Sequence, residues 1–310
     1  MIAGFVRHRA ARPLLLAGVA AALFAPGPSL AARDALDKSL FVSVLDASGT
    51  PLKDLTLGDV LIREDNVDRE VIAIKPASQP ISVAVLVDTA QGTRVADAYG
   101  TVEQYTTDIR TSASAFAKTL LSKSPDAAVS LMEFGQAAIP IVPFTKNIED
   151  FEKGVARIFP KANVPSVLME AIVDANKDLA SRPSPRRAIV TMNLEPSDEQ
   201  SKEETKTIVN SFRESGAQLW SVSVQRGGLK NSKRDVVIND FAKNTGGRRD
   251  YLMGISAVPQ IFQKYAEALT YQYEVVFQRP ESKKPPKAIQ IGSSRPGVKL
   301  HASVYPLQPR

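Results

Sequence analysis

Two kinds of hydrophobic pattern divide the chain. Near both ends lie short β-like runs, bounded by the turn-forming residues that favour strands. They read FVSVL (41–45), VLIRE (60–64) and VIAIK (71–75) at the front, and YEVVF (273–277), AIQI (288–291) and VKLHASVY (298–305) at the back. Asp65-Asn66 suits a turn between the second and third runs. Because the two flanks are alike, we predict a small β domain built from both.

The middle of the chain has a different pattern. Nearly continuous apolar runs, typical of strands covered on both faces, alternate with stripes at helical spacing. The apolar runs are ISVAVLVD (81–88), AAVSLMEF (127–134), AAIPIVPF (137–144), AIVTM (188–192) and AQLWSVSV (217–224). The second and third are close enough to pair as a hairpin, and Pro140 and Pro143 place the third at an edge. Trp220 lies within the last run, which favours a role in core packing.

The helical stripes lie between and after these runs. They fall at 102–120, 168–179, 208–212, 236–243 and 258–269. Thr101 and Gln104 form a capping box before the first stripe, and Gly216 can close the third helix. Strands that alternate with helices predict an α/β fold, with a doubly wound, mostly parallel sheet and helices on both faces.

The first residues indicate export. Arg7, Arg9 and Arg12 precede an apolar stretch, LLLAGVAAALFA, that is short for a membrane span. Ser29-Leu30-Ala31 then offers small residues at the two positions that a signal peptidase reads. We predict a signal peptide over 1–31 with cleavage after Ala31, and an uncleaved anchor is the alternative. Later segments are too short or too polar to cross a membrane, so a periplasmic or secreted protein is expected.

The predicted organisation therefore has four parts. A signal peptide (1–31) is followed by an N-terminal β segment (32–79), the α/β domain (80–270) and a C-terminal β segment (271–310) that packs with the first β segment. The 310 residues are 44% hydrophobic and 23% charged, which is enough apolar material for a large core.

Composition excludes several kinds of chemistry. The chain has no cysteine, so disulfides, thiolate metal sites and cysteine nucleophiles are excluded. Removal of 1–31 lowers the formal net charge from +6 to +3. The basic clusters at Arg226 to Arg234 and at Lys283, Lys284 and Lys287 stand among Gly, Ser, Asn or Pro, which favours solvated loops. Together with export, this argues against nucleic acid as a partner.

The histidine count argues against catalysis. His8 and His301 are the only histidines, and His8 leaves with the signal peptide. A Ser–His–Asp triad would have to use His301, which we place on the surface of a terminal strand. No phosphate-binding Walker loop is present. We therefore expect no enzymatic activity, and an envelope hydrolase remains as a second alternative.

In a doubly wound sheet, binding sites form at the carboxyl ends of the strands. Three loops lie there: the loop after Asp88, the loop from Asn163 to Ser166, and the loop after Met192. At this point the sequence resembles the von Willebrand factor A-type domain, and in particular bacterial exported proteins with a β segment on each side of that domain. The matching stretches are VSVLDASGTPLKDLTLGDVLIREDN, ISVAVLVDT, SVLMEAI, RRAIVTM, FAKNTGGR and RPGVKLHASVY, which together span about residues 40 to 305.

The resemblance implies a metal-ion-dependent adhesion site (MIDAS). In that site an Asp-x-Ser-x-Ser loop, a threonine and a third-loop aspartate hold Mg²⁺, and a partner's carboxylate completes the octahedral shell. In this chain Asp88 matches the first Asp, but Ala90 and Gly92 replace the two serines. Ser166 matches the threonine, and Leu194 replaces the aspartate.

Nearby residues offer substitute ligands. These are Thr89 and Thr93 beside the first loop and Glu195 and Asp198 in the third. Without a metal, Asp88 can accept hydrogen bonds from N–H groups of the turn that follows it, and Ser166 can serve as a helix N-cap. We interpret the site as a degenerate MIDAS.

The resulting expectation is an exported, non-catalytic protein-binding module that needs no cofactor. Its protein partners are not identified by the sequence. The alternative is an adhesion module dependent on Mg²⁺ or Mn²⁺, held by Asp88, Ser166 and a displaced acid.

Overall fold

The computed structural model describes residues 35–91, 102–195, 197–225, 232–280 and 286–302. Its largest sheet has six strands in the order β12-β11-β10-β5-β7-β8. Their bounds are β5 Ile81–Asp88, β7 Ala128–Phe134, β8 Ala138–Thr145, β10 Arg186–Glu195, β11 Gln218–Gln225 and β12 Arg248–Leu252. Neighbouring strands are parallel except for β7 and β8, which form the predicted antiparallel hairpin.

The burial of each strand follows its sequence pattern. Every residue of β5 and of β10 is buried, because helices cover both faces of the sheet centre. β8 lies at the edge, as Pro140 and Pro143 predicted, and its pairing with β7 is interrupted by two register shifts. Proline and bulges both protect a sheet edge from pairing with another chain.

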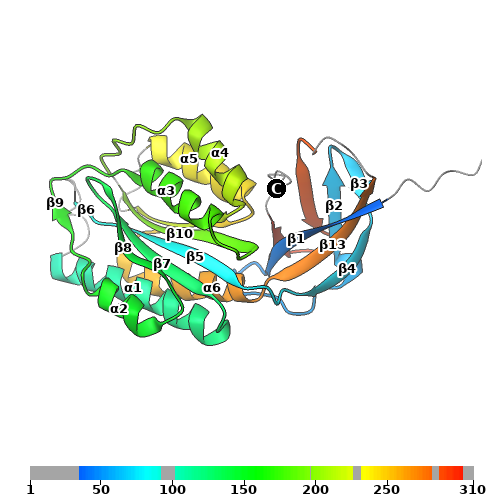
Figure 1. Cartoon of the computed structure of the whole chain (residues 1–310), viewed down its shortest axis with the longest axis horizontal. Coiled ribbons are helices and arrows are strands. Elements are labelled where there is room, and N and C mark those ends of the chain that lie inside the picture. The colour runs from blue at the N-terminus through cyan, green and yellow to red at the C-terminus, as the bar shows by residue number, and fades with distance from the viewer. Residues whose placement is uncertain (1–34, 92–101, 196, 226–231, 281–285, 303–310) are drawn as a thin grey trace, which may run out of the picture. The chain divides into compact units, whose positions relative to one another are not determined.

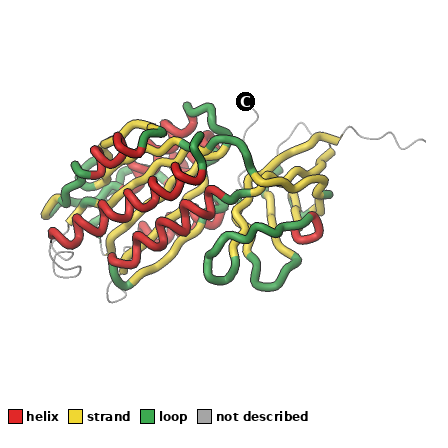
Figure 2. Tube along the Cα trace, turned by 90° about the horizontal axis from the view of Figure 1, so that it is seen from below, coloured by secondary structure: helices red, strands yellow, loops and turns green. Residues whose placement is uncertain are grey.

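Helices cover the two faces of this sheet (Figure 1). α3, α4 and α5 lie on one face, and α1, α2 and α6 on the other, where two long helices run side by side in Figure 2. The bounds are α1 Val102–Lys123, α2 Ile148–Val155, α3 Leu168–Ala180, α4 Thr205–Ser215, α5 Ser232–Asn244 and α6 Val258–Thr270. Gly216 closes α4 at a φ of 66°, in the left-handed region that glycine adopts readily. Thr101, half of the predicted capping box, lies outside the described residues.

The flanks form two further sheets, with strand orders β15-β1-β13-β4 and β14-β2-β3. The bounds are β1 Ala35–Leu45, β2 Val60–Glu64, β3 Val67–Arg69, β4 Val71–Pro76, β13 Tyr273–Pro280, β14 Ile289–Ser293 and β15 Lys299–His301. β1 pairs with β13 over eight residue pairs, and both sheets contribute to one separate apolar core. This confirms the predicted fold class, including a small β domain built from both flanks.

Two further observations concern predictions from the sequence. Within the described residues, no helix has the length and apolar character to cross a membrane. His301, which we predicted at the surface, is half-buried: its Nδ1 lies 2.8 Å from the Gly247 carbonyl oxygen, and its ring packs near Trp220. The periodicity of the short β15 strand could not reveal this contact, because it depends on a turn 54 residues away.

Candidate functional site

The three predicted loops meet at one edge of the sheet. Asp88 ends β5, Glu195 ends β10, and Ser166 precedes α3, and all three residues are fully buried. A backbone bridge joins Ser166 to Glu199 in the third loop, so this loop lies beside the second. The topology therefore brings together residues that are far apart in the sequence.

Asp88 is bound on both oxygens. Its Oδ1 accepts a hydrogen bond from the Ala90 N–H at 3.1 Å, as predicted for the turn after the strand. Its Oδ2 accepts from the Leu194 N–H at 3.1 Å and from Nη1 of Arg234 at 3.0 Å. The carboxylate thus joins two loops of the site to α5.

Arg234 occupies the centre of the site. Its side chain has no exposed surface. Besides the bond to Asp88, its Nε donates to Oε2 of Glu199 at 2.6 Å, its Nη2 donates to Oγ of Ser166, and its Nη1 donates to the Leu194 carbonyl oxygen at 3.3 Å. Oε1 of Glu195 lies 3.6 Å from Nη1. One guanidinium therefore contacts groups from all three loops.

This arrangement overturns two predictions. The N-cap of α3 is Val167, so Ser166 does not cap the helix, and its hydroxyl accepts from Arg234 instead. Arg234 itself belongs to the basic stretch that we assigned to a solvated loop. Only 226–231 of that stretch lie outside the described residues, and Arg234 is buried in the first turn of α5.

The remaining predicted residues have different places. Ala90 and Leu194 join the site through their backbone, and the Leu194 side chain lies in the apolar core. Thr89 is buried, and its hydroxyl has no hydrogen-bond partner among the described residues. Asp198 is exposed, and its Oδ2 accepts from the side chain of Gln200.

Gly92 and Thr93 lie outside the described residues. Glu199, which no pattern in the sequence singled out, joins the site by accepting a hydrogen bond from Arg234.

The electrostatics of the site follow from its burial. Burial raises the pKa of Asp88 to about 6, while Arg234 and the two backbone N–H groups oppose that shift. Burial also acts to lower the pKa of Arg234, but the carboxylates of Asp88, Glu199 and Glu195 outweigh it and raise the pKa. At neutral pH the site therefore holds an ionised aspartate and a permanent internal cation.

These residues do not fit a divalent ion as they stand. The oxygens that would coordinate Mg²⁺, on Asp88 and Ser166, already accept hydrogen bonds from Arg234. A divalent cation beside a guanidinium would also meet strong repulsion in a buried setting. No group of three acidic or histidine side chains among the described residues is arranged to hold a metal.

The loop after Asp88 is tied to its neighbours. The Tyr105 hydroxyl donates to the Asp88 carbonyl oxygen at 2.9 Å, and the Lys161 N–H donates to the Thr89 carbonyl oxygen at 2.8 Å. Two short strands, β6 Ala90–Gln91 and β9 Lys161–Ala162, pair in parallel next to it. The backbone of the first loop is therefore held by α1 and by β9, and its Asp88 side chain is held by Arg234.

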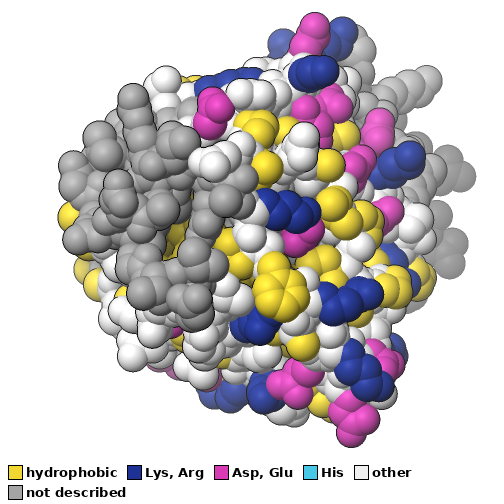
Figure 3. All heavy atoms as spheres, turned by 90° about the vertical axis from the view of Figure 1, so that its left-hand side faces the viewer, with side chains coloured by type: hydrophobic (Ala, Val, Ile, Leu, Met, Phe, Trp, Pro, Cys, Tyr) yellow, Lys and Arg dark blue, Asp and Glu magenta, His cyan; other side chains and the backbone are white. Residues whose placement is uncertain are grey.

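The face at the ends of the strands carries exposed apolar side chains. Among the described residues, nine large hydrophobic side chains are exposed, and four of them belong to the small β domain. The other five lie at or near the strand ends: Ile139, Phe159, Val236, Tyr251 and Met253. Figure 3 looks onto this end of the molecule and shows hydrophobic side chains interspersed with Lys and Arg. We call these five residues the strand-end apolar group.

Comparison with known proteins supports the fold. Neither the protein-family models nor the curated proteins contain a match to the sequence. A structure of proximal thread matrix protein 1 from the mussel byssus, with a zinc-occupied MIDAS motif, has a TM-score of 0.51 at 9% identity and covers 68% of this chain and 50% of that chain.

Two bacterial structures also match. A von Willebrand factor type A structure from Catenulispora acidiphila has a TM-score of 0.49 at 9% identity and covers 88% of this chain and 74% of that chain. The protein BatB from Bacteroides thetaiotaomicron has a TM-score of 0.44 at 15% identity and covers 61% of this chain and 98% of that chain. At such low identities the likeness extends to the fold alone. With its doubly wound sheet and the site at its strand ends, the chain has a von Willebrand factor A-type fold.

Proposed function

We propose that this protein is an exported, non-catalytic protein-binding module whose strand-end site works without a metal. The observation that carries the proposal is the buried Arg234 guanidinium, which is bound to Asp88, Ser166 and Glu199. It supplies from within the chain the positive charge that an ion would supply in a MIDAS. The loops are thereby held in place without a bound ion.

The internal cation also changes how a partner can bind. In a MIDAS the partner's carboxylate reaches the metal, but the Arg234 side chain is completely enclosed and its bonds are used internally. A partner must therefore use the surface around the site. The strand-end apolar group supplies such contacts, because large apolar and aromatic side chains dominate the energy of most protein interfaces.

The signal-peptide pattern at 1–31 supports export. The single histidine left after cleavage lies against Gly247 and Trp220, away from the strand-end site, which supports a non-catalytic role. The predicted partner is thus a protein met in the envelope or outside the cell.

The test is capture of partners from an extract of the protein's own envelope, with mature protein as bait. We expect the same partner to be captured with Mg²⁺ and with EDTA. Phe159→Asp and Met253→Asp, at side chains that are 62% and 68% exposed, should abolish capture. Leu61→Asp on the small β domain is the matched control, since Leu61 is 56% exposed, and it should capture normally.

Two outcomes would contradict the proposal. Capture that is lost in EDTA and regained with Mg²⁺ would support the metal-dependent alternative. Capture that is abolished by Leu61→Asp but unaffected by the other two variants would place the binding surface on the small β domain.

A further inference from the structure

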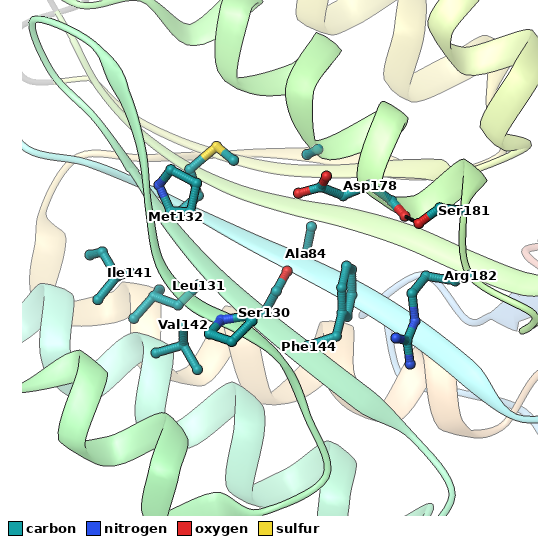
Figure 4. Close-up of a pocket in the computed structure, with 13 residues that line it drawn as sticks. Ala84, Ser130, Leu131, Met132, Ile141, Val142, Phe144, Asp178, Ser181 and Arg182 are labelled. Atoms are coloured by element: carbon teal, nitrogen blue, oxygen red, sulfur yellow. Dashed lines mark hydrogen bonds between the residues drawn. The ribbon is translucent and has the colours of Figure 1, made fainter.

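A hollow lies between α3 and the edge strands of the large sheet, apart from the strand-end site (Figure 4). Its volume is about 390 Å³, within the range of small-ligand pockets. Ala84 of β5, Met132 of β7 and Phe144 of β8 supply its apolar surface. Ser130, Asp178 and Arg182 supply its polar groups.

The two charged residues of the hollow do not pair with each other. Asp178 lies in the last turn of α3, and Arg182 lies two residues beyond the end of that helix. Instead, the Arg182 guanidinium lies over the Phe144 ring, with Cζ 4.9 Å from the ring centroid, and its Nε is 3.5 Å from Oγ of Ser82. Within the described residues, the Asp178 carboxylate has no ion pair or side-chain hydrogen bond, and Arg182 has no carboxylate partner.

Opposite charges that are left unpaired in one hollow are complementary to a ligand with both charges. Figure 4 shows the Asp178 carboxylate and the Ser130 hydroxyl on either side of the Ala84 methyl group, with Arg182 beside Phe144. An ammonium group can bind at Asp178, a carboxylate at the Arg182 fork, and an apolar side chain over Ala84 and Met132. The Ser130 hydroxyl is placed for a polar group between them, such as an amide.

The volume of the hollow narrows the ligand class. About 390 Å³ lies within the range of pockets that hold drug-sized ligands, which are larger than a single amino acid. A peptide of three residues spans at most ~10 Å between its charged ends. We propose that the hollow binds short zwitterionic peptides, with a free amino terminus at Asp178 and a free carboxyl terminus at Arg182. This proposal does not rest on the strand-end function.

The test uses the mature chain with isotope-labelled methionine methyl groups, followed by NMR. The probe is the free tripeptide Ala-Leu-Ala, and its acetylated and amidated form is the control without terminal charges. We expect the free peptide to shift the Met132 signal at millimolar concentration and to leave that of Met253, at the strand ends, unchanged. The blocked peptide should shift neither signal.

Variants test the two charges separately. Asp178→Asn and Arg182→Gln should each weaken binding about tenfold or more, as expected when a bond to a charged group is lost. Asp174→Asn is the matched control, because Asp174 is exposed on the same helix but does not line the hollow. Arg182→Lys keeps the charge without the fork and should bind with intermediate affinity. Thermal unfolding verifies that each variant is folded.

The proposal is overturned if the blocked peptide binds as well as the free one, or if folded Asp178→Asn and Arg182→Gln bind with unchanged affinity. It is also overturned if the free peptide leaves the Met132 signal unmoved. A shift of Met253 with an unmoved Met132 would assign the peptide to the strand-end face.

Discussion

Replacement of Arg234 by alanine tests whether the guanidinium holds the strand-end site together. The variant loses the bonds to Asp88, Glu199 and Ser166 and leaves buried carboxylates without their cation. Removal of one partner from a buried ion pair costs about 3–5 kcal/mol. For a chain of this size each kcal/mol lowers the melting temperature by roughly 2–4 °C, so we expect a fall of about 6–20 °C.

A second measurement asks whether the guanidinium stands in for an ion. Without Arg234, the oxygens of Asp88, Ser166 and Glu199 become free to bind a divalent cation. An ion at ~100 times its Kd would restore about 2.7 kcal/mol. Arg234→Ala should therefore regain roughly 5–10 °C when Mg²⁺ or Mn²⁺ replaces EDTA at equal ionic strength.

The control for this experiment is Arg186→Ala. Arg186 is also buried, but its hydrogen-bond partners among the described residues are neutral: Oε1 of Gln272 and the carbonyl oxygens of Gln79 and Leu269. Its loss should also lower the melting temperature, but without any recovery in Mg²⁺. If the melting temperature of Arg234→Ala lies within about 1 °C of the wild-type value, the fall is far smaller than expected, and the structural role of the guanidinium is refuted. A recovery of equal size in both variants would show that Mg²⁺ acts elsewhere.

Four further predictions follow from the sequence and the fold. In wild type, Mg²⁺ and Mn²⁺ should leave the melting temperature unchanged relative to EDTA, and a clear rise that disappears in Asp88→Ala would restore the metal-dependent interpretation. Burial lowers the pKa of His301, so its neutral form stabilises the fold above the unfolded pKa near 6.5, and this stability is lost as pH falls through the lower folded pKa. Urea titrations should therefore show that His301→Gln loses less free energy of unfolding than wild type between neutral and mildly acid pH. Equal losses in the two proteins would count against this. Deletion of 272–310 removes β13 and should expose the apolar face of β1 and cause aggregation, whereas a soluble product with unchanged melting would contradict the shared core. Amino-terminal sequencing of exported protein should begin at Ala32, and an intact Met1 would identify an anchor.

The sequence by itself determined most of the fold. A strand that is covered on both faces has a nearly continuous apolar sequence. The apolar runs of β5 and β10 therefore predicted the central positions of these strands in the sheet. Pro140 and Pro143 likewise predicted the edge, because proline cannot donate a hydrogen bond to a neighbouring strand. The position of Asp88 at a strand end also followed from local pattern, as did the bond from the turn to its carboxylate.

The tertiary structure alone decided what surrounds Asp88. Arg234 lies 146 residues from Asp88, 68 from Ser166 and 35 from Glu199, and no local periodicity links these positions. In the sequence, Arg234 stands in a polar basic stretch, where a charged side chain is usually solvated. It is buried because α5 begins where three loops present carboxylates and carbonyl oxygens, and these groups replace the water that the guanidinium gives up. The partners of a buried charge are set by the way distant segments pack, so this feature of the site became visible only in the folded chain.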